Sequence, residues 1–140
     1  MNSELAKVEL DREGSIAIAT LSGEVDMSNA PSVRQRLSEG VTPDDEALVI
    51  DLGPLSFIDS AGLHVLFDIA AALAERRQHL RLVVPQGSQV ARAVELVGLP
   101  GTISVDPDRA AAIEAAESLT SESRPVPPEG ASTDRPSTDR

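Results

Sequence analysis

The sequence of 140 residues contains no cysteine, tryptophan or tyrosine and only two phenylalanines. Without cysteine, the chain has neither disulfide bonds nor cysteine-ligated metal ions. With two aromatic rings, it offers little surface on which nucleic-acid bases or sugars could stack. The core of the protein must therefore consist of Leu, Ile, Val and Ala side chains.

Long apolar runs and an excess of positive charge are also missing. A transmembrane helix requires about 18 consecutive apolar residues, and the sequence contains no such run. Charged residues interrupt the apolar residues at its start, so this segment does not have the pattern of a signal peptide. Lys and Arg number 12 against 23 Asp and Glu, a net charge of −11, which argues against a protein that coats nucleic-acid phosphates. We therefore expect a soluble, cytoplasmic protein with no membrane contact and no direct nucleic-acid contact.

The two ends of the chain differ in composition. Residues 120–140 contain four prolines and one large apolar residue, Val126. Such a segment buries too little apolar surface to offset its loss of conformational entropy on folding. We therefore expect one folded domain over residues 1–119, followed by a disordered tail rich in Pro, Ser and Thr at 120–140.

The apolar pattern of the folded part alternates between the periods of strands and helices. The apolar run at 47–52 indicates a strand buried on both faces, and helical spacing follows Ser60. The pattern predicts strands at 5–10, 16–21, 47–52, 80–84 and 103–105, and helices between Ser28 and Gly40 and at 60–78, 88–97 and 108–119. Because alternating strands and helices require crossovers, we expect a small α/β domain. Its mixed, mostly parallel β-sheet packs against helices and has the first hairpin as an antiparallel edge.

The segment 55–63 connects the most apolar strand to the second helix and contains the clearest candidate site. Asp59 and Ser60 fall at the helix N-terminus, where free N–H groups and the helix dipole favour an anion. Ser60 can cap the helix, and Gly62 leaves the first turn open, so that a docking group can approach the backbone. The same residue types are ordinary caps, so this segment alone indicates only the start of a helix.

Several enzyme motifs are missing from the sequence. It has no GxxxxGK[ST] phosphate loop, and its serine is not in a GxSxG turn because position 58 is Ile. His64 follows Ser60 by four residues on the same helix face, so an enzyme that uses Ser60, His64 and an aspartate is one alternative. Because no oxyanion loop or metal-site motif accompanies the pair, we expect neither catalysis nor a cofactor.

Four segments together resemble the STAS domain, in particular the free-standing bacterial anti-sigma factor antagonists. They are LSGEVD (21–26), VIDL (49–52), FIDSAGL (57–63) and RAVELVGL (92–99), and the resemblance extends over about residues 5–117. It implies a single STAS-like domain that regulates transcription, for instance in a stress response, by binding other proteins.

The resemblance implies partner switching controlled by Ser60. In such proteins the unphosphorylated antagonist binds an anti-sigma factor that is also a serine kinase, and a sigma factor is thereby freed. The kinase phosphorylates the serine that follows the aspartate, here Ser60; the phosphorylated form releases the kinase, and a separate serine phosphatase restores it. The residues implied in partner binding are Gly23, Glu24, Asp26, Asp59, Ser60, Ala61, Gly62, Leu63 and His64.

Two positions depart from the family pattern. Ala61 stands where the family commonly has a second Ser or Thr, which makes Ser60 the one hydroxyl at this cap. His64 stands where a small residue, usually Gly, is common. Its imidazole is a candidate for influencing the choice of partner or the pH dependence of docking.

A second role is compatible with the same resemblance. The chain would then be a STAS scaffold subunit of a transporter ATPase or of a larger signalling assembly, and Ser60 would be dispensable. In either role we expect a monomer or a weak dimer, because the first hairpin leaves an exposed strand edge.

Overall fold

The computed structural model describes residues 6–96, 98 and 103–123, which form six strands and four helices. In chain order these are β1 (Ala6–Glu13), β2 (Ile16–Val25), α1 (Ala30–Glu39), β3 (Ala47–Asp51), β4 (Leu55–Ile58), α2 (Ser60–Glu75), β5 (His79–Val83), α3 (Gln89–Leu96), β6 (Ser104–Asp106) and α4 (Arg109–Ser123). None of the helices in these residues is long and apolar enough to cross a membrane.

The strands form one sheet in the order β1-β2-β3-β5-β6, with β4 paired to β2 beyond the end of β3. β1 is antiparallel to β2, and the other strand pairs are parallel. The predicted α/β domain with a mixed, mostly parallel sheet is therefore confirmed. The apolar run of β3 has the predicted cause: Ala47 to Ile50 are fully buried because helices cover both faces of the sheet.

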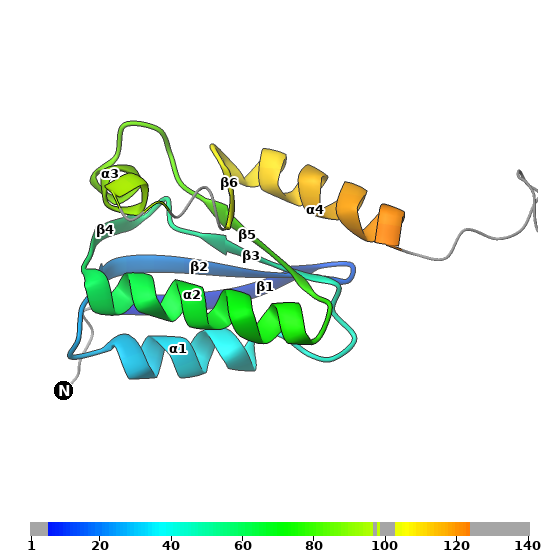
Figure 1. Cartoon of the computed structure of the whole chain (residues 1–140), viewed down its shortest axis with the longest axis horizontal. Helices are drawn as coiled ribbons and strands as arrows, with labels where there is room; N and C mark the ends of the chain where they lie inside the picture. The colour runs from blue at the N-terminus through cyan, green and yellow to red at the C-terminus, as the bar shows by residue number, and fades with distance from the viewer. Residues whose placement is uncertain (1–5, 97, 99–102, 124–140) are drawn as a thin grey trace, which may run out of the picture.

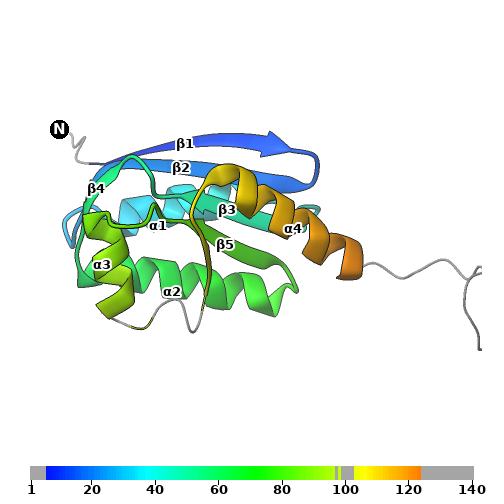
Figure 2. The same cartoon turned by 90° about the horizontal axis from the view of Figure 1, so that it is seen from above.

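Two hydrophobic clusters lie on the two faces of the sheet. On β3, Leu48 and Ile50 belong to the larger cluster, with α1, α2 and α3, whereas Val49 belongs to the smaller cluster, with α4. Figure 1 shows α1 and α2 side by side on one face and α4 on the other. In the view of Figure 2, α4 lies over β3 and β5.

The sequence prediction missed β4 and misplaced the hairpin turn. Residues 55–58 were expected only to connect a strand to a helix, but they pair in parallel with the last part of β2, which itself runs on to Val25. The turn of the first hairpin was expected at 11–14. It lies instead at Gly14 and Ser15, between longer strands, and Gly14 has the positive φ of 62° that such tight turns require.

The expected element ends also shift. α2 was expected to reach residue 78 but ends at Glu75, because Arg77 takes a φ of 61° that no helix accommodates. α4 continues to Ser123, past the expected boundary at 119. The expected ends at Leu5 and Val97, and the remainder of the expected tail at 124–140, lie outside the described residues.

The strands β2 to β6 all end at the same side of the sheet, here called the carboxyl edge, because they are parallel. α1, α2, α3 and α4 each start shortly after one of these strand ends. The free N–H groups and positive dipole ends of the helices therefore gather at the carboxyl edge, where open α/β sheets generally bind ligands. From this edge α4 runs back towards the opposite end of the molecule, where β1 turns into β2, here called the hairpin end (Figure 1).

The start of α4 is fixed to the sheet by Arg109. Its guanidinium donates to Asp51 Oδ2 from Nε at 3.1 Å and from Nη2 at 3.0 Å, and to Thr20 Oγ1 at 2.5 Å. These contacts join α4 to the middle of β2 and to the end of β3. Asp51, the acidic residue of the VIDL segment, therefore has a structural partner within the domain.

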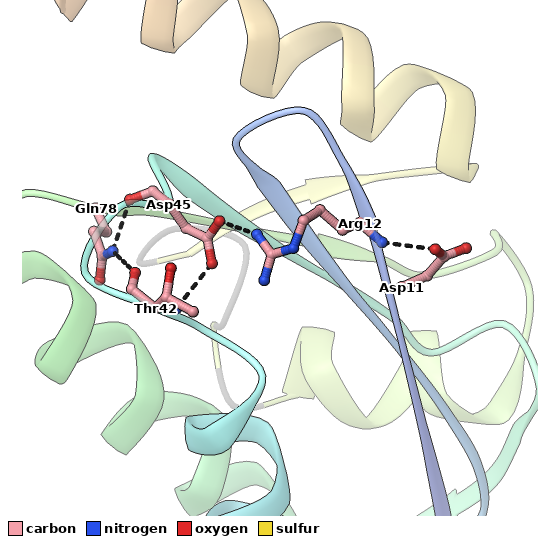
Figure 3. Close-up of polar contacts among 5 residues, drawn as sticks. All are labelled: Asp11, Arg12, Thr42, Asp45 and Gln78. Carbon is pink, nitrogen blue, oxygen red and sulfur yellow. Dashed lines mark hydrogen bonds and ion pairs between the residues drawn. The ribbon is translucent and has the colours of Figure 1, made fainter.

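The hairpin end of the molecule is closed by a polar cluster of Arg12, Thr42, Asp45 and Gln78, here called the hairpin-end cluster (Figure 3). The Asp45 carboxylate is paired with the Arg12 guanidinium and accepts the Thr42 N–H at 2.8 Å. Gln78 Nε2 donates to the carbonyl oxygens of Thr42 and Asp45 at 2.9 and 2.7 Å. The cluster thereby joins β1, the loop before β3 and the loop before β5.

Candidate functional site

The candidate site forms where β4 ends beside β2. Val25 pairs with Ile58, and the ladder continues as the Asp59 N–H donates to the Val25 carbonyl oxygen at 3.1 Å. Val25 and Ile58 are buried, so hydrophobic packing fixes the chain at this point. Asp26 and Asp59, which follow these two residues, therefore emerge at the same part of the carboxyl edge, as the sequence hypothesis requires.

Asp59, and not Ser60, caps α2. The Asp59 backbone is extended, with φ −105° and ψ −171°, as a cap residue must be, and its Oδ1 accepts the Gly62 N–H at 3.0 Å. Ser60 is the first residue of the helix, and it is exposed. Sequence reasoning placed the helix start correctly, but its expectation that Ser60 could cap the helix was wrong, because the hydrogen bond to Val25 holds Asp59 extended in the cap position.

Gly62 has a different role from the expected one. It is buried, and a Cβ atom at this position would lie 2.5 Å from Ile58 Cγ1 and 2.9 Å from Val25 Cγ1. The glycine therefore allows the first turn of α2 to pack closely against β2 and β4, instead of leaving room for a docking group. Leu63 is buried as well and Ala61 half-buried, so these residues shape the site from beneath.

The loop between β2 and α1 is held by its own polar side chains. Asp26 Oδ1 accepts the Ser28 hydroxyl at 2.5 Å and the Ser28 N–H at 2.9 Å. These two hydrogen bonds, the hydroxyl first, hold the pKa of Asp26 below its usual value. Asn29, at the N-cap position of α1, accepts the Asp26 N–H and donates to the Glu24 carbonyl oxygen, both at 2.9 Å.

Gly23 starts this loop with a backbone that few other residues adopt. Its φ is 89°, and the register between β2 and β4 shifts between Gly23 and Glu24, which marks a β-bulge. The Ser56 hydroxyl donates to the Gly23 carbonyl oxygen at 2.9 Å and so holds the bulge against β4. Gly23 thus shapes the backbone before Glu24, which is exposed, and its part in partner binding stays a prediction.

Two exposed apolar side chains on the segments beside Asp26 and Asp59 were missed by the sequence analysis. Met27 is 78% exposed in the loop before α1, and Phe57 is 45% exposed on β4, in register with Glu24. We call the surface made by these residues the serine face; it comprises Glu24, Asp26, Met27, Phe57, Asp59, Ser60 and His64. The sequence offered one indication for Phe57, its position in the FIDSAGL segment. That its ring is exposed follows only from the pairing of β4 with β2, which the sequence did not predict.

His64 lies one helical turn beyond Ser60 and its side chain is 76% exposed. Its Nε2 is 3.6 Å from Asp68 Oδ1, one further turn along α2, and the other carboxylate oxygen of Asp68 is 3.8 Å from Arg34 Nη1 on α1. The imidazole is thus engaged with a carboxylate that does not contact Ser60. This geometry differs from the serine–histidine–aspartate arrangement of the enzyme alternative.

Within the described ranges, no group of three or more His, Asp or Glu residues could hold a metal ion. A cavity of about 250 Å³ lies between α3 and the ends of β5 and β6. Asp106, on its wall, is bound by the Arg81 guanidinium at 2.6 and 3.1 Å and is therefore a structural ion pair.

Fold and site define a small α/β domain whose candidate site is an exposed surface around one serine, held in place by a buried strand pairing. A model of the STAS domain matches residues 7–112. The chain belongs to the STAS domain family, among the anti-sigma factor antagonists. The resemblance drawn from the four sequence segments is thereby confirmed.

Individual relatives agree with this family. The anti-sigma-F factor antagonist RsfB of Mycobacterium tuberculosis is 34% identical over 88 residues, which cover 62% of this chain and 70% of the relative. The crystal structure of an anti-sigma factor antagonist from Mycobacterium paratuberculosis is 27% identical, with a TM-score of 0.72 over 80% of this chain and 94% of that one.

More distant structures share the fold alone. The unphosphorylated form of the anti-sigma factor antagonist SpoIIAA has a TM-score of 0.60 at 19% identity and covers 81% of this chain and 98% of its own. A sulfate transporter family protein from Wolinella succinogenes has a TM-score of 0.66 at 16% identity, and the match covers 76% of this chain and 88% of that one. Because antagonists and a transporter-family protein share this fold, the function must be argued from the serine face.

Proposed function

We propose that this chain is an anti-sigma factor antagonist that switches partners through Ser60. The unphosphorylated form binds an anti-sigma factor of the serine-kinase type in the cytoplasm, and a sigma factor is freed. That kinase phosphorylates Ser60, the complex dissociates, and a serine phosphatase restores the binding form. The names of the relatives support an antagonist, and one fold neighbour is described in an unphosphorylated form.

The observation that carries the proposal is that Asp59 caps α2 while the neighbouring Ser60 is exposed and is not needed as the cap. Asp59 makes the capping hydrogen bond, so a phosphate on Ser60 removes no bond that holds the start of α2. The dianion of about −1.5 to −2 charges also meets the free N–H groups and the positive dipole end of the helix. The fold therefore tolerates the modification.

A docked partner does not tolerate the same charge. The serine face already carries the carboxylates of Glu24, Asp26 and Asp59, whereas Met27 and Phe57 offer apolar surface for contact. Exposed apolar side chains beside the centre of an interface are typical binding anchors. Burying the dianion beside these carboxylates, out of contact with water, costs several kcal/mol, which corresponds to a loss of about a hundredfold or more in affinity.

The first test is phosphorylation of the purified chain by its candidate kinase with ATP, followed by intact mass. We expect one phosphate on the natural chain and none on Ser60→Ala. Incubation with the candidate phosphatase should remove the phosphate and restore binding to the kinase. Phosphate that persists in Ser60→Ala would refute the assignment of the acceptor.

The second test separates charge at Ser60 from charge in general. Ser60→Asp should keep the melting temperature of the natural chain within a few degrees and bind the kinase at least about a hundredfold more weakly by calorimetry. Ser38→Asp, which introduces the same charge at an exposed serine near the other end of α1, should bind normally. Equal binding by Ser60→Asp and the natural chain would favour the scaffold role, in which Ser60 is dispensable.

A further inference from the structure

Four side chains form a row that starts at Ser60 and crosses from α2 to α1. Ser60, His64 and Asp68 are spaced by four residues and therefore lie along one face of α2. Asp68 stands between two cationic groups, 3.6 Å from His64 Nε2 and 3.8 Å from Arg34 Nη1. With the imidazole protonated, His64 and Arg34 are positively charged and Asp68 is negatively charged. Ser60 is then the one residue of the row without a charge.

The row contributes little to the stability of the unmodified domain. Both pairs are longer than hydrogen bonds and largely exposed, with 76% of the His64 side chain and 54% of the Arg34 side chain accessible, and such surface pairs are worth about 0–1 kcal/mol. A cationic imidazole in the second turn of a helix is also close to the wrong end of the dipole. His64 thus gains little from its pair with Asp68 and stands where an additional anion would stabilise its charge.

We infer that His64 pairs with the phosphate of phosphorylated Ser60, an inference that rests on the proposed function and adds a residue to it. An anion four residues before a cation is the more favourable orientation on a helix. Phosphorylation completes a row of alternating charge in which Asp68 keeps Arg34 as a partner. His64 therefore stabilises the phosphorylated, partner-free state and leaves the unmodified state unaffected.

This role distinguishes His64 from a contact made to the partner. A partner contact would weaken docking of the unmodified chain when it is removed. A phosphate contact instead changes the unfolding equilibrium of the phosphorylated chain alone. The two roles can therefore be separated without any partner present.

The experiment is a double-mutant cycle on the full chain, with phosphoserine introduced at position 60 during translation. The four proteins carry serine or phosphoserine at position 60, each with or without His64→Gln, and their unfolding in urea is measured at pH 6.0, where an ordinary imidazole is largely protonated. We expect phosphorylation to shift the unfolding constant about two- to fivefold more in favour of the folded state with His64 present. The phosphate should also deprotonate at a lower pH, by ³¹P NMR, than in His64→Gln.

The matched control is His79→Gln, which changes the other histidine of the chain, at the start of β5 on the hairpin end. The phosphate effect in this background should equal that in the natural chain. An equal phosphate effect with and without His64 would overturn the inference. Because the phosphoserine is introduced without the kinase, this result is independent of whether the kinase modifies Ser60, which the tests of the proposed function decide.

Discussion

At the hairpin end, Asp45 is only 4% exposed, and its carboxylate is bound by Arg12 and by the Thr42 N–H. At the carboxyl edge, Asp26 and Asp59 are also hydrogen-bonded, but to residues two or three positions away, and they remain accessible. Long-range bonds at one end join three segments of the chain, whereas local bonds at the other end hold two loops in shape. The comparison teaches that the polar groups of the hairpin end hold the fold, whereas those beside Ser60 shape an accessible surface, the one that we propose binds a partner.

The largest effect on stability is expected at the hairpin-end cluster. Asp45→Ala should lower the free energy of unfolding by about 2–3 kcal/mol, because it removes a buried carboxylate and leaves the Thr42 N–H and the Arg12 guanidinium without their acceptor. Urea denaturation measures this loss, and binding of the folded variant to the kinase should be unchanged. Asp44→Ala, at the exposed neighbouring position, is the control and should change stability by less than about 0.5 kcal/mol.

The next effect is expected on binding and not on stability. Phe57→Ala should weaken kinase binding by about thirtyfold, the cost of about 2 kcal/mol that is typical of an aromatic anchor. Leu10→Ala removes a side chain of nearly equal exposure, 46% against 45%, from β1, away from the serine face, and should bind normally. If calorimetry gave both variants the same affinity as the natural chain, Phe57 would not be a binding anchor. The proposal that the serine face contacts the partner would then be contradicted at this residue.

Gly62→Ala tests whether the glycine serves packing or access. The added methyl group would meet Ile58 and Val25, and overpacking of this kind costs about 1–3 kcal/mol. Alanine is favoured over glycine in a helix by about 1 kcal/mol, so a net loss of about 1 kcal/mol is expected in thermal unfolding. A gain in melting temperature would contradict the close packing of α2 on β2 and β4.

The smallest effect concerns Asp26 and acid. Its pKa is lowered in the folded chain from 3.8 by the hydrogen bonds from Ser28. This contribution to stability is therefore present above pH 3.8 and is lost as the pH falls through the lower folded value. The stability advantage of the natural chain over Asp26→Asn in urea should be present at pH 6 and shrink at pH 3. A constant advantage would show that the carboxylate is not held by Ser28 in solution.

Local patterns predicted most of the fold. The apolar run of β3, the helical spacing of α2 and the glycine after α1 each depend on neighbouring residues, so a sequence displays them. β4 was missed because Ser56 and Phe57 are both exposed between two buried residues, which breaks the alternation that marks a strand.

The candidate site could be predicted only in part for a similar reason. FIDSAGL located Ser60 at a helix start, but whether Asp59 or Ser60 forms the cap depends on the bond to Val25, far away in the sequence. The same holds for Gly62, whose neighbours Ile58 and Val25 come from two strands. Asp45, Arg12 and Gln78 likewise meet only after three segments fold together, so the hairpin-end cluster had no sequence signal.

The direction of α4 has a practical consequence. The helix is fastened by Arg109 at the carboxyl edge and ends, at Ser123, towards the hairpin end, whereas α2 begins at the opposite side (Figure 1). A fluorophore or surface anchor joined after Ser123 would therefore project away from the face that contains Ser60. The chain can be immobilised by this end for kinetic measurements while the proposed binding surface stays open to the solution.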